Sequence, residues 1–230
     1  GDERIALDAA LLPMALCNDA VVRRGEGRWE LVGDPTEGAL VVLAAKGGLD
    51  VDRIRARHPR LAEVPFDSAN KFMATVHELA DSDGDRSVTV FVKGAPDVLI
   101  GRSSRVIGRD GGAEPIAAHA DELREHNDRL ASDGLRVLAV AQRVLAPEDW
   151  AEFTSQGGDP IELVRDLTLV ALAGIVDPPR PEATAAIAEA GQASVAQTSR
   201  QRELRAAIES TRLVQSEAGI ALRTSKEESR

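Results

Sequence analysis

The 230-residue chain has a single cysteine, Cys17, no tyrosine, four phenylalanines and two tryptophans. With one cysteine no disulfide can form within the chain, which fits a reducing compartment. The formal net charge of −10 argues against sequence-independent nucleic-acid binding, which needs a basic surface. The apolar runs are much shorter than the ~20 residues of a membrane-spanning helix. We therefore expect a soluble chain that contacts neither nucleic acid nor membrane.

Familiar catalytic signatures are missing as well. The sequence has no G-x-x-x-x-G-K-[ST] loop, no G-x-G-x-x-G motif and no G-x-S-x-G motif. His119 and His126 lie seven residues apart in a polar, helix-like segment, where solvent exposure is a better interpretation than metal binding. Asp83 and Asp85 belong to a turn-like segment, and turn formation is their simplest role. We expect no metal site and no self-contained catalytic set.

The order of helix-like and strand-like segments predicts an α+β fold, with a mainly antiparallel, twisted sheet flanked by helices. Asp34 suits the N-cap and Pro35 the first position of a helix that ends before Gly47. Glu37, three residues after the cap, would complete a capping box. The segments "NKFMATVHEL" and "SVTVFV" flank a turn at residues 81–85 and predict a β-hairpin. The predicted helices cover residues 5–16, 35–46, 51–57, 95–100 and 117–131, and two strong strands cover 135–145 and 166–177.

Composition sets the end of the chain, from about residue 192, apart from what precedes it. Residues 1–176 hold the predicted sheet, and residues 177–191 form a proline-rich connection that opens a helix. Residues 192–230 are rich in Ser, Arg, Glu and Gln and have few large apolar side chains with which to join a core. We expect a polar carboxy-terminal extension there, either helical or disordered.

Six short motifs carry more information by their order and spacing than any one of them does alone. They are "ALCNDA" (15–20), "GDPTEGAL" (33–40), "PFDSANKFMATVHE" (65–78), "FVKGAPDVLI" (91–100), "DGLRVLAVA" (133–141) and "GIVDPPRPEA" (174–183). Together they closely resemble the nucleotide-binding (N) domain of P-type cation-transporting ATPases of type II, the group of calcium pumps and sodium/potassium pumps. The resemblance covers about residues 1–191. It implies an N domain at 1–176 and, at 177–191, the hinge and the first helix of a phosphorylation domain.

The resemblance implies an adenine-nucleotide pocket formed by these motifs. Phe66 occupies the position of the ring that stacks on adenine, a contact worth ~1–3 kcal/mol by analogy with base stacking. Without the resemblance, a core phenylalanine at a strand end would be the better interpretation. Glu37 matches the carboxylate that accepts a hydrogen bond from the adenine amino group, and Leu138 matches an apolar wall of the pocket.

Basic residues of the same motifs are expected at the phosphates or the adenine nitrogens. Lys71, expected on the same strand as Phe66, and Lys93 would form an electropositive mouth at one end of the sheet, where Lys93 would also be the floor of the pocket. Gly94 would allow a close approach of backbone or ligand beside Lys93. Arg136 matches a phosphate-contacting guanidinium, since an arginine within an apolar strand must be paired or point into a cleft. Ser68 departs from the family pattern, because some members carry an arginine there.

The resemblance further implies the cytosolic domain of a plasma-membrane cation pump that uses Mg-ATP. In such a pump the domain delivers the γ-phosphate to an aspartate by rotating at a hinge, and it works with phosphorylation and actuator domains. The "DPPR" hinge motif is present as Asp177, Pro178, Pro179 and Arg180, but the "DKTGT" motif with the phosphorylated aspartate is absent from this chain. We therefore expect a chain truncated before the rest of the phosphorylation domain, which binds ATP without hydrolysing it.

Two other functions stay open at the level of sequence. A self-standing phosphatase or kinase-like enzyme would need a nucleophile and a base at suitable spacing, and none is evident. A degenerate module could keep the N-domain fold and bind a partner protein through its acidic surface or its tail. The second alternative predicts no adenine-nucleotide binding.

Overall fold

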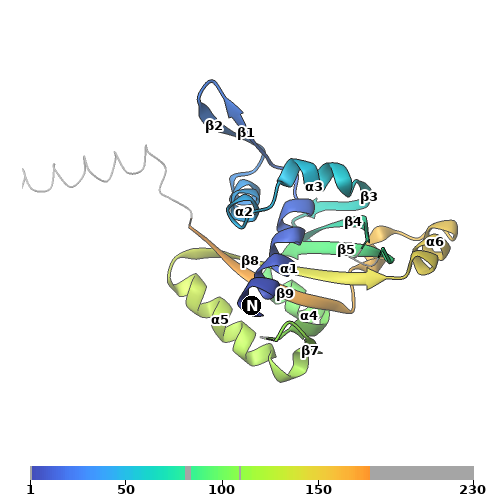
Figure 1. Cartoon of the computed structure of the whole chain (residues 1–230). Helices are drawn as coiled ribbons and strands as arrows, with labels where there is room; N and C mark the ends of the chain where they lie inside the picture. Colours follow the sequence, from blue (N-terminus) through green and yellow to red (C-terminus); the bar gives the residue numbers. More distant parts are fainter. Residues whose placement is uncertain (1, 81–83, 109, 177–230) are drawn as a thin grey trace, which may run out of the picture. The chain divides into compact units, whose positions relative to one another are not determined.

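The computed structural model describes residues 2–80, 84–108 and 110–176. Helices and strands are interspersed along the chain (Figure 1). In chain order they are α1 (Asp2–Leu16), β1 (Val21–Gly25), β2 (Arg28–Val32), α2 (Pro35–Lys46), α3 (Val51–Arg57), β3 (Arg60–Asp67), β4 (Phe72–Ala80), β5 (Arg86–Gly94), α4 (Pro96–Arg102), β6 (Ser103–Ile107), β7 (Ala113–Pro115), α5 (Ala120–Ser132), β8 (Leu135–Leu145), α6 (Pro147–Ser155) and β9 (Leu167–Val176), with short 3-10 helices at Ile116–Ala118 and Pro160–Leu163.

Within the described residues, seven strands form one sheet in the order β3-β4-β5-β8-β9-β6-β7, and β1 and β2 form a separate hairpin. Neighbouring strands are antiparallel except for β6 and β9, which are parallel. The α+β class and the mainly antiparallel sheet are therefore confirmed. The parallel pair was not predicted, because a single strand-like segment does not reveal which distant strand it will join.

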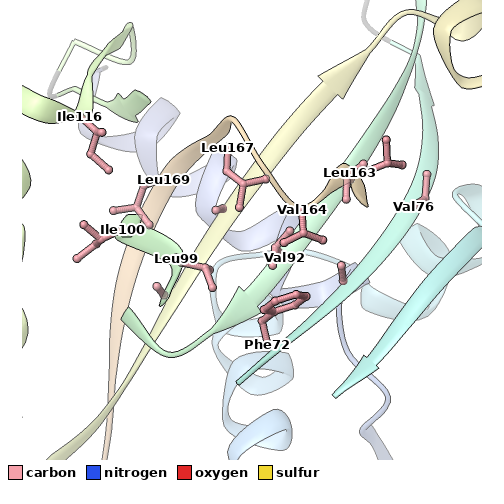
Figure 2. Packing of buried hydrophobic residues seen from close by; sticks show 14 of the residues in the cluster. Phe72, Val76, Val92, Leu99, Ile100, Ile116, Leu163, Val164, Leu167 and Leu169 are labelled. Atoms are coloured by element: carbon pink, nitrogen blue, oxygen red, sulfur yellow. The ribbon is translucent and has the colours of Figure 1, made fainter. Parts of the chain in front are cut away.

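The two faces of the sheet are covered by different helices. Val90 of β5 packs into the main core together with Leu99 of α4, and burial of each such side chain stabilises the fold by ~1.5–3 kcal/mol. Figure 2 shows this core, with Val92 of the same strand and Leu99 labelled. Phe91, the next residue, belongs to a smaller cluster that contains Leu16 of α1. Because side chains alternate along a strand, Lys93 projects from the same face as Phe91. Helix α2 lies on that face as well, where it contacts α1.

Local sequence signals account for α2 in detail. Asp34 has extended backbone angles, and its side chain accepts hydrogen bonds from the N–H groups of Thr36 at 2.8 Å and Glu37 at 3.2 Å. Pro35 is the first helical residue and Gly47 follows the last. The predicted bounds of this helix are confirmed, because capping depends on residues that are neighbours in the sequence.

Several expectations fall on residues outside the described ranges. They are the hinge residues Asp177 to Arg180, the helix predicted to follow them, the tail at 192–230, and part of the turn at 81–85. Among the described residues, no helix combines the length and the apolar character needed to cross a bilayer.

His77 of β4 is a buried ionisable group on the α1 face of the sheet. Its Nδ1 donates to the backbone carbonyl of His58 at 2.8 Å, and its ring lies 5.9 Å from that of Phe91. Among the described residues, its Nε2 has no hydrogen-bond partner. Burial lowers the pKa of His77 below its ordinary value of 6.5, because a charged imidazolium would lose its hydration there.

This lowered pKa makes folding sensitive to mild acid. The unfolded chain binds a proton at His77 more readily than the folded chain, so the stabilisation is complete above about pH 6.5 and is lost as the pH falls below it. We expect the free energy of unfolding in urea to decrease between pH 7.5 and pH 5.5. His77→Gln, which stays neutral, should show a smaller decrease over that range. An equal decrease in both proteins would contradict the prediction.

Candidate functional site

A pocket of about 500 Å³ lies where the start of α2 faces the ends of β3, β5 and β8. Its volume is within the ~300–1,000 Å³ common for small-molecule sites. All seven residues singled out from the sequence line it, namely Glu37, Phe66, Lys71, Lys93, Gly94, Arg136 and Leu138. Asp34, Thr36, Ala95 and Val137 complete the wall and were not assigned to the site from the sequence.

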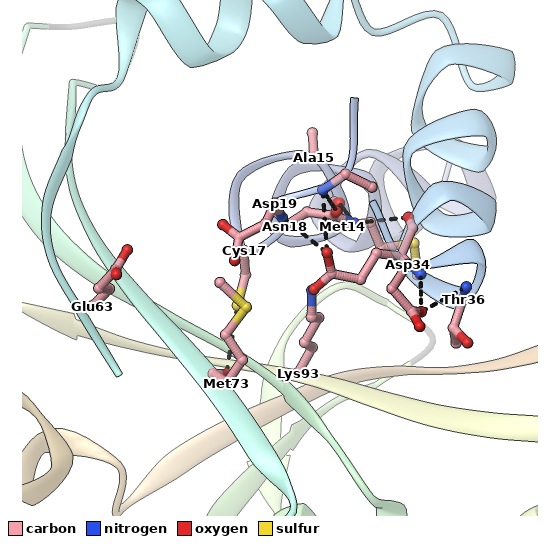
Figure 3. A network of polar contacts seen from close by, with 12 residues as sticks. Met14, Ala15, Cys17, Asn18, Asp19, Asp34, Thr36, Glu63, Met73 and Lys93 are labelled. Atoms are coloured by element: carbon pink, nitrogen blue, oxygen red, sulfur yellow. Dashed lines mark hydrogen bonds and ion pairs between the residues drawn. The ribbon is translucent and has the colours of Figure 1, made fainter. Parts of the chain in front are cut away.

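Lys93 forms the buried floor of this pocket rather than part of its mouth. It lies within β5, in register with Met73 of β4 and Val140 of β8. Its Nζ makes an ion pair with Oε1 of Glu37 (Figure 3), and the two side chains are only 7% and 17% exposed. The expectation of two lysines at an electropositive mouth is therefore wrong for Lys93, because Glu37 compensates its charge inside the protein.

The second carboxylate oxygen of Glu37 is held by the turn that follows α1. Oε2 accepts hydrogen bonds from the backbone N–H groups of Asp19 and Ala20, each at 3.1 Å. The capping-box role expected for Glu37 is wrong, since its carboxylate bonds to this turn and to Lys93 and not to the start of its own helix. Sequence spacing alone did not show that residues 15–20 would lie beside α2.

Phe66 and Lys71 lie on the exposed side of the pocket. Phe66 ends β3 with 65% of its surface exposed, which excludes the alternative of a core phenylalanine. Lys71 is in the turn between β3 and β4 with a φ of +58°, not on the strand of Phe66 as expected. Its Nζ lies 3.9 Å from Oδ2 of Asp97, in a pair whose side chains are 58% and 70% exposed, so water screens this contact.

Gly94 is required by the approach of the Lys71 turn. A Cβ atom at position 94 would lie 2.5 Å from the carbonyl oxygen of Lys71 and 2.7 Å from Cβ of Phe72. The same carbonyl accepts a hydrogen bond from the N–H of Ala95 at 3.0 Å. The expected close approach beside Lys93 is thus made by the protein's own backbone.

Arg136 links β8 to the start of α2. Its Nη1 donates to Oγ1 of Thr36 at 3.1 Å, and its exposed guanidinium lines the pocket beside Leu138. Burial alone would raise the pKa of Asp34, but the hydrogen bonds from Glu37 and Thr36 and the charge of Arg136 lower it overall. Asp34 therefore stays ionised as a helix cap and adds negative charge to one side of the pocket.

A second cavity, of about 610 Å³, lies between the β1–β2 hairpin, α2 and α3. Its wall is mainly apolar, and Trp29 on its edge is 71% exposed. Two of its charged residues already have structural roles, since Asp50 caps α3 and Arg55 donates to backbone carbonyls. We take the smaller pocket as the candidate site because it combines an exposed aromatic ring with several converging charged groups. The described ranges contain no group of three or more His, Cys, Asp or Glu side chains arranged to hold a metal ion.

Comparison with known proteins identifies similar chains. A family model described as the cytoplasmic domain N of P-type ATPases matches residues 6–182. A calcium-transporting ATPase of Bacillus subtilis is 37% identical over 198 residues, which cover 84% of this chain and 21% of the relative. The cation-transporting ATPase pma1 of Synechocystis is 37% identical over 181 residues, covering 79% of this chain and 18% of the relative. A probable cation-transporting ATPase F of Mycobacterium tuberculosis is 38% identical over 193 residues, covering 83% and 20%. The chain thus spans about a fifth of the length of these relatives.

The ion pair between Glu37 and Lys93 predicts a large stability cost when one partner is removed. Glu37→Ala leaves a nearly buried ammonium without its counter-charge, so we expect the free energy of unfolding to fall by about 3 kcal/mol. Glu63→Ala, which removes the exposed partner of Arg60, is the control and should cost ~0–1 kcal/mol. Urea unfolding of the three proteins measures both, and equal costs would show that the pair is not effectively buried.

Because Gly94 lies against the Lys71 turn, we expect substitution by alanine to affect stability differently at Gly94 and at Gly101. Gly94→Ala forces backbone atoms apart and should destabilise the fold by ~1–3 kcal/mol. Gly101→Ala, in α4 where an added Cβ meets nothing within 4 Å, should be neutral or stabilising by up to ~1 kcal/mol. Thermal unfolding distinguishes them, and a neutral Gly94→Ala would refute the proposed close approach.

Proposed function

This chain belongs to the family of cytoplasmic N domains of P-type ATPases, and we propose that it binds ATP in the pocket between α2 and the sheet. The observation that carries the proposal is that one pocket has both an exposed aromatic ring, Phe66, and the buried ion pair of Lys93 and Glu37. Adenine presents a flat face for stacking, and its edge carries both hydrogen-bond donors and acceptors. A lysine ammonium and a carboxylate side by side match such an edge, since one only donates and the other accepts.

The distribution of charge supports an orientation for the nucleotide. Lys93 is 6% exposed at the floor of the pocket, where it can reach the base. Lys71 and Arg136 are exposed at the rim, where cations can meet phosphates while water still screens the excess charge. We therefore propose that adenine lies between Phe66 and Leu138 and that the triphosphate extends past Lys71 and Arg136.

We further propose the role of this domain in a complete protein. The relatives named above are cation-transporting or calcium-transporting ATPases, and an N domain in such a pump would deliver the γ-phosphate of Mg-ATP to an aspartate that this chain lacks. Rotation at Asp177 to Arg180 would bring the nucleotide to the phosphorylation domain, with the actuator domain as a further partner. The domain would then lie on the cytoplasmic side of the plasma membrane.

Calorimetric titration with ATP tests the proposal. We expect saturable binding to the unmodified chain and a loss of affinity of about tenfold or more in Phe66→Ala, since base stacking contributes ~1–3 kcal/mol. Trp29→Ala removes another exposed aromatic residue and should leave the affinity unchanged. Absence of saturable binding would favour the partner-binding module, and equal affinities of Phe66→Ala and the unmodified chain would refute the proposed site.

The proposed orientation is tested by comparing ATP with adenosine. Lys71→Met and Arg136→Met should each weaken ATP binding severalfold and leave adenosine binding unchanged, because both side chains are assigned to the phosphates. Charge-assisted contacts of this kind are worth ~1.5–3 kcal/mol each at most, and less at an exposed rim. A matching loss for adenosine would mean that these side chains contact the base instead.

A further inference from the structure

Arg55 of α3 does not line the candidate nucleotide pocket, yet it holds the turn on which that pocket rests. Its Nε donates to the carbonyl of Ala15 at 2.9 Å, its Nη1 to that of Ala20 at 3.0 Å and its Nη2 to that of Asn18 at 3.1 Å. The three nitrogens of one guanidinium thus bind three carbonyls of one short segment. We infer that Arg55 is a positioning residue for the nucleotide pocket, acting through this turn on Glu37 and Lys93.

Residues 15–20, which are the last two residues of α1 and the turn that follows them, transmit the position of Arg55 to α2 and are called the turn below. The side-chain amide of Asn18 donates to the backbone carbonyl of Glu37 at 2.9 Å, and its Oδ1 accepts from the N–H of Ala20 at 2.9 Å. The N–H groups of Asp19 and Ala20 bind the carboxylate of Glu37. The backbone and the side chain of Glu37 are therefore both fixed by the turn, whose residues Asn18 and Asp19 are labelled in Figure 3. Each carbonyl that Arg55 binds lies within this turn or at its ends.

The fork shape of arginine is needed for this role. A guanidinium is planar and offers several donors in fixed directions, whereas a lysine ammonium is a point charge that cannot reach three separated carbonyls at once. Arg60 also contacts the turn, since its Nη2 lies 3.2 Å from the carbonyl of Asn18 and 2.9 Å from Oδ1 of Asp19. Of these two arginines, Arg55 is the one that bonds to both ends of the turn. A turn that loses Arg55 is free to shift its N–H groups away from Glu37, which releases Lys93 from its fixed direction.

The expected effect on ATP binding rests on the proposed nucleotide function, whereas the positioning of Lys93 by Arg55 does not. The test measures the two separately. In the ligand-free domain, an ion-paired buried lysine gives a slowly exchanging ammonium signal in ¹H–¹⁵N spectra, which Lys93→Met assigns by removing it. Arg55→Lys should broaden or abolish this signal while urea unfolding shows that the domain remains folded. Arg53→Lys, a change on the exposed side of the same helix, should leave it intact.

ATP titration of a double-mutant cycle then tests whether Arg55 acts through Glu37. Arg55→Lys should weaken ATP binding about tenfold, or ~1.4 kcal/mol, in the unmodified chain. In the Glu37→Ala background, Arg55→Lys should cause no further loss of ATP affinity, because the turn then has no carboxylate to position. Glu37→Leu, which has a side chain of similar size without an acceptor, serves as the background if Glu37→Ala does not fold.

Each result decides the inference. A broadened Lys93 signal together with a non-additive cycle supports it. An unchanged Lys93 signal in Arg55→Lys, or an equal loss of ATP affinity in both backgrounds, overturns it. If the unmodified chain binds no ATP, the proposed function fails, and the ammonium signal alone still decides whether Arg55 positions Lys93.

Discussion

The buried ion pair between Glu37 and Lys93 joins the two layers that form the candidate site. Lys93 belongs to a central strand, and Glu37 belongs to a helix on one face of the sheet. Two charges placed away from water are tolerated only when they compensate each other in good geometry. The ion pair therefore constrains where α2, the turn after α1 and the floor of the pocket lie relative to one another. A shift of any of the three would leave a buried charge without its partner.

Features set by neighbouring residues were predictable from the sequence. The N-cap at Asp34 and the proline after it set the start of α2, and two strand-like segments on either side of a turn identified β4 and β5. The α+β class followed from the order of these segments. The family resemblance identified seven positions that the structure brings together around one pocket, although their individual roles toward a nucleotide stay predictions.

Features set by distant residues were not predictable in the same way. The sequence placed Lys93 at a strand end, where a charged residue is normally exposed, and only the packing of α2 against the sheet reveals its partner. Glu37 had the spacing of a capping box, but the turn at residues 15–20 offered its N–H groups to the same carboxylate. Arg55 gave no signal at all, because hydrogen bonds to backbone carbonyls leave no pattern in side-chain types.

The pocket draws its walls from segments that are far apart in the chain, from Asp34 to Leu138. Contacts between such distant segments form late and slowly in folding, because each closes a long loop of chain. The site therefore exists only once β3, β5 and β8 have come together with α2, and no short peptide from this chain can reproduce it. Any molecule that binds there binds the folded state alone, so by mass action its concentration will raise the stability of the entire domain.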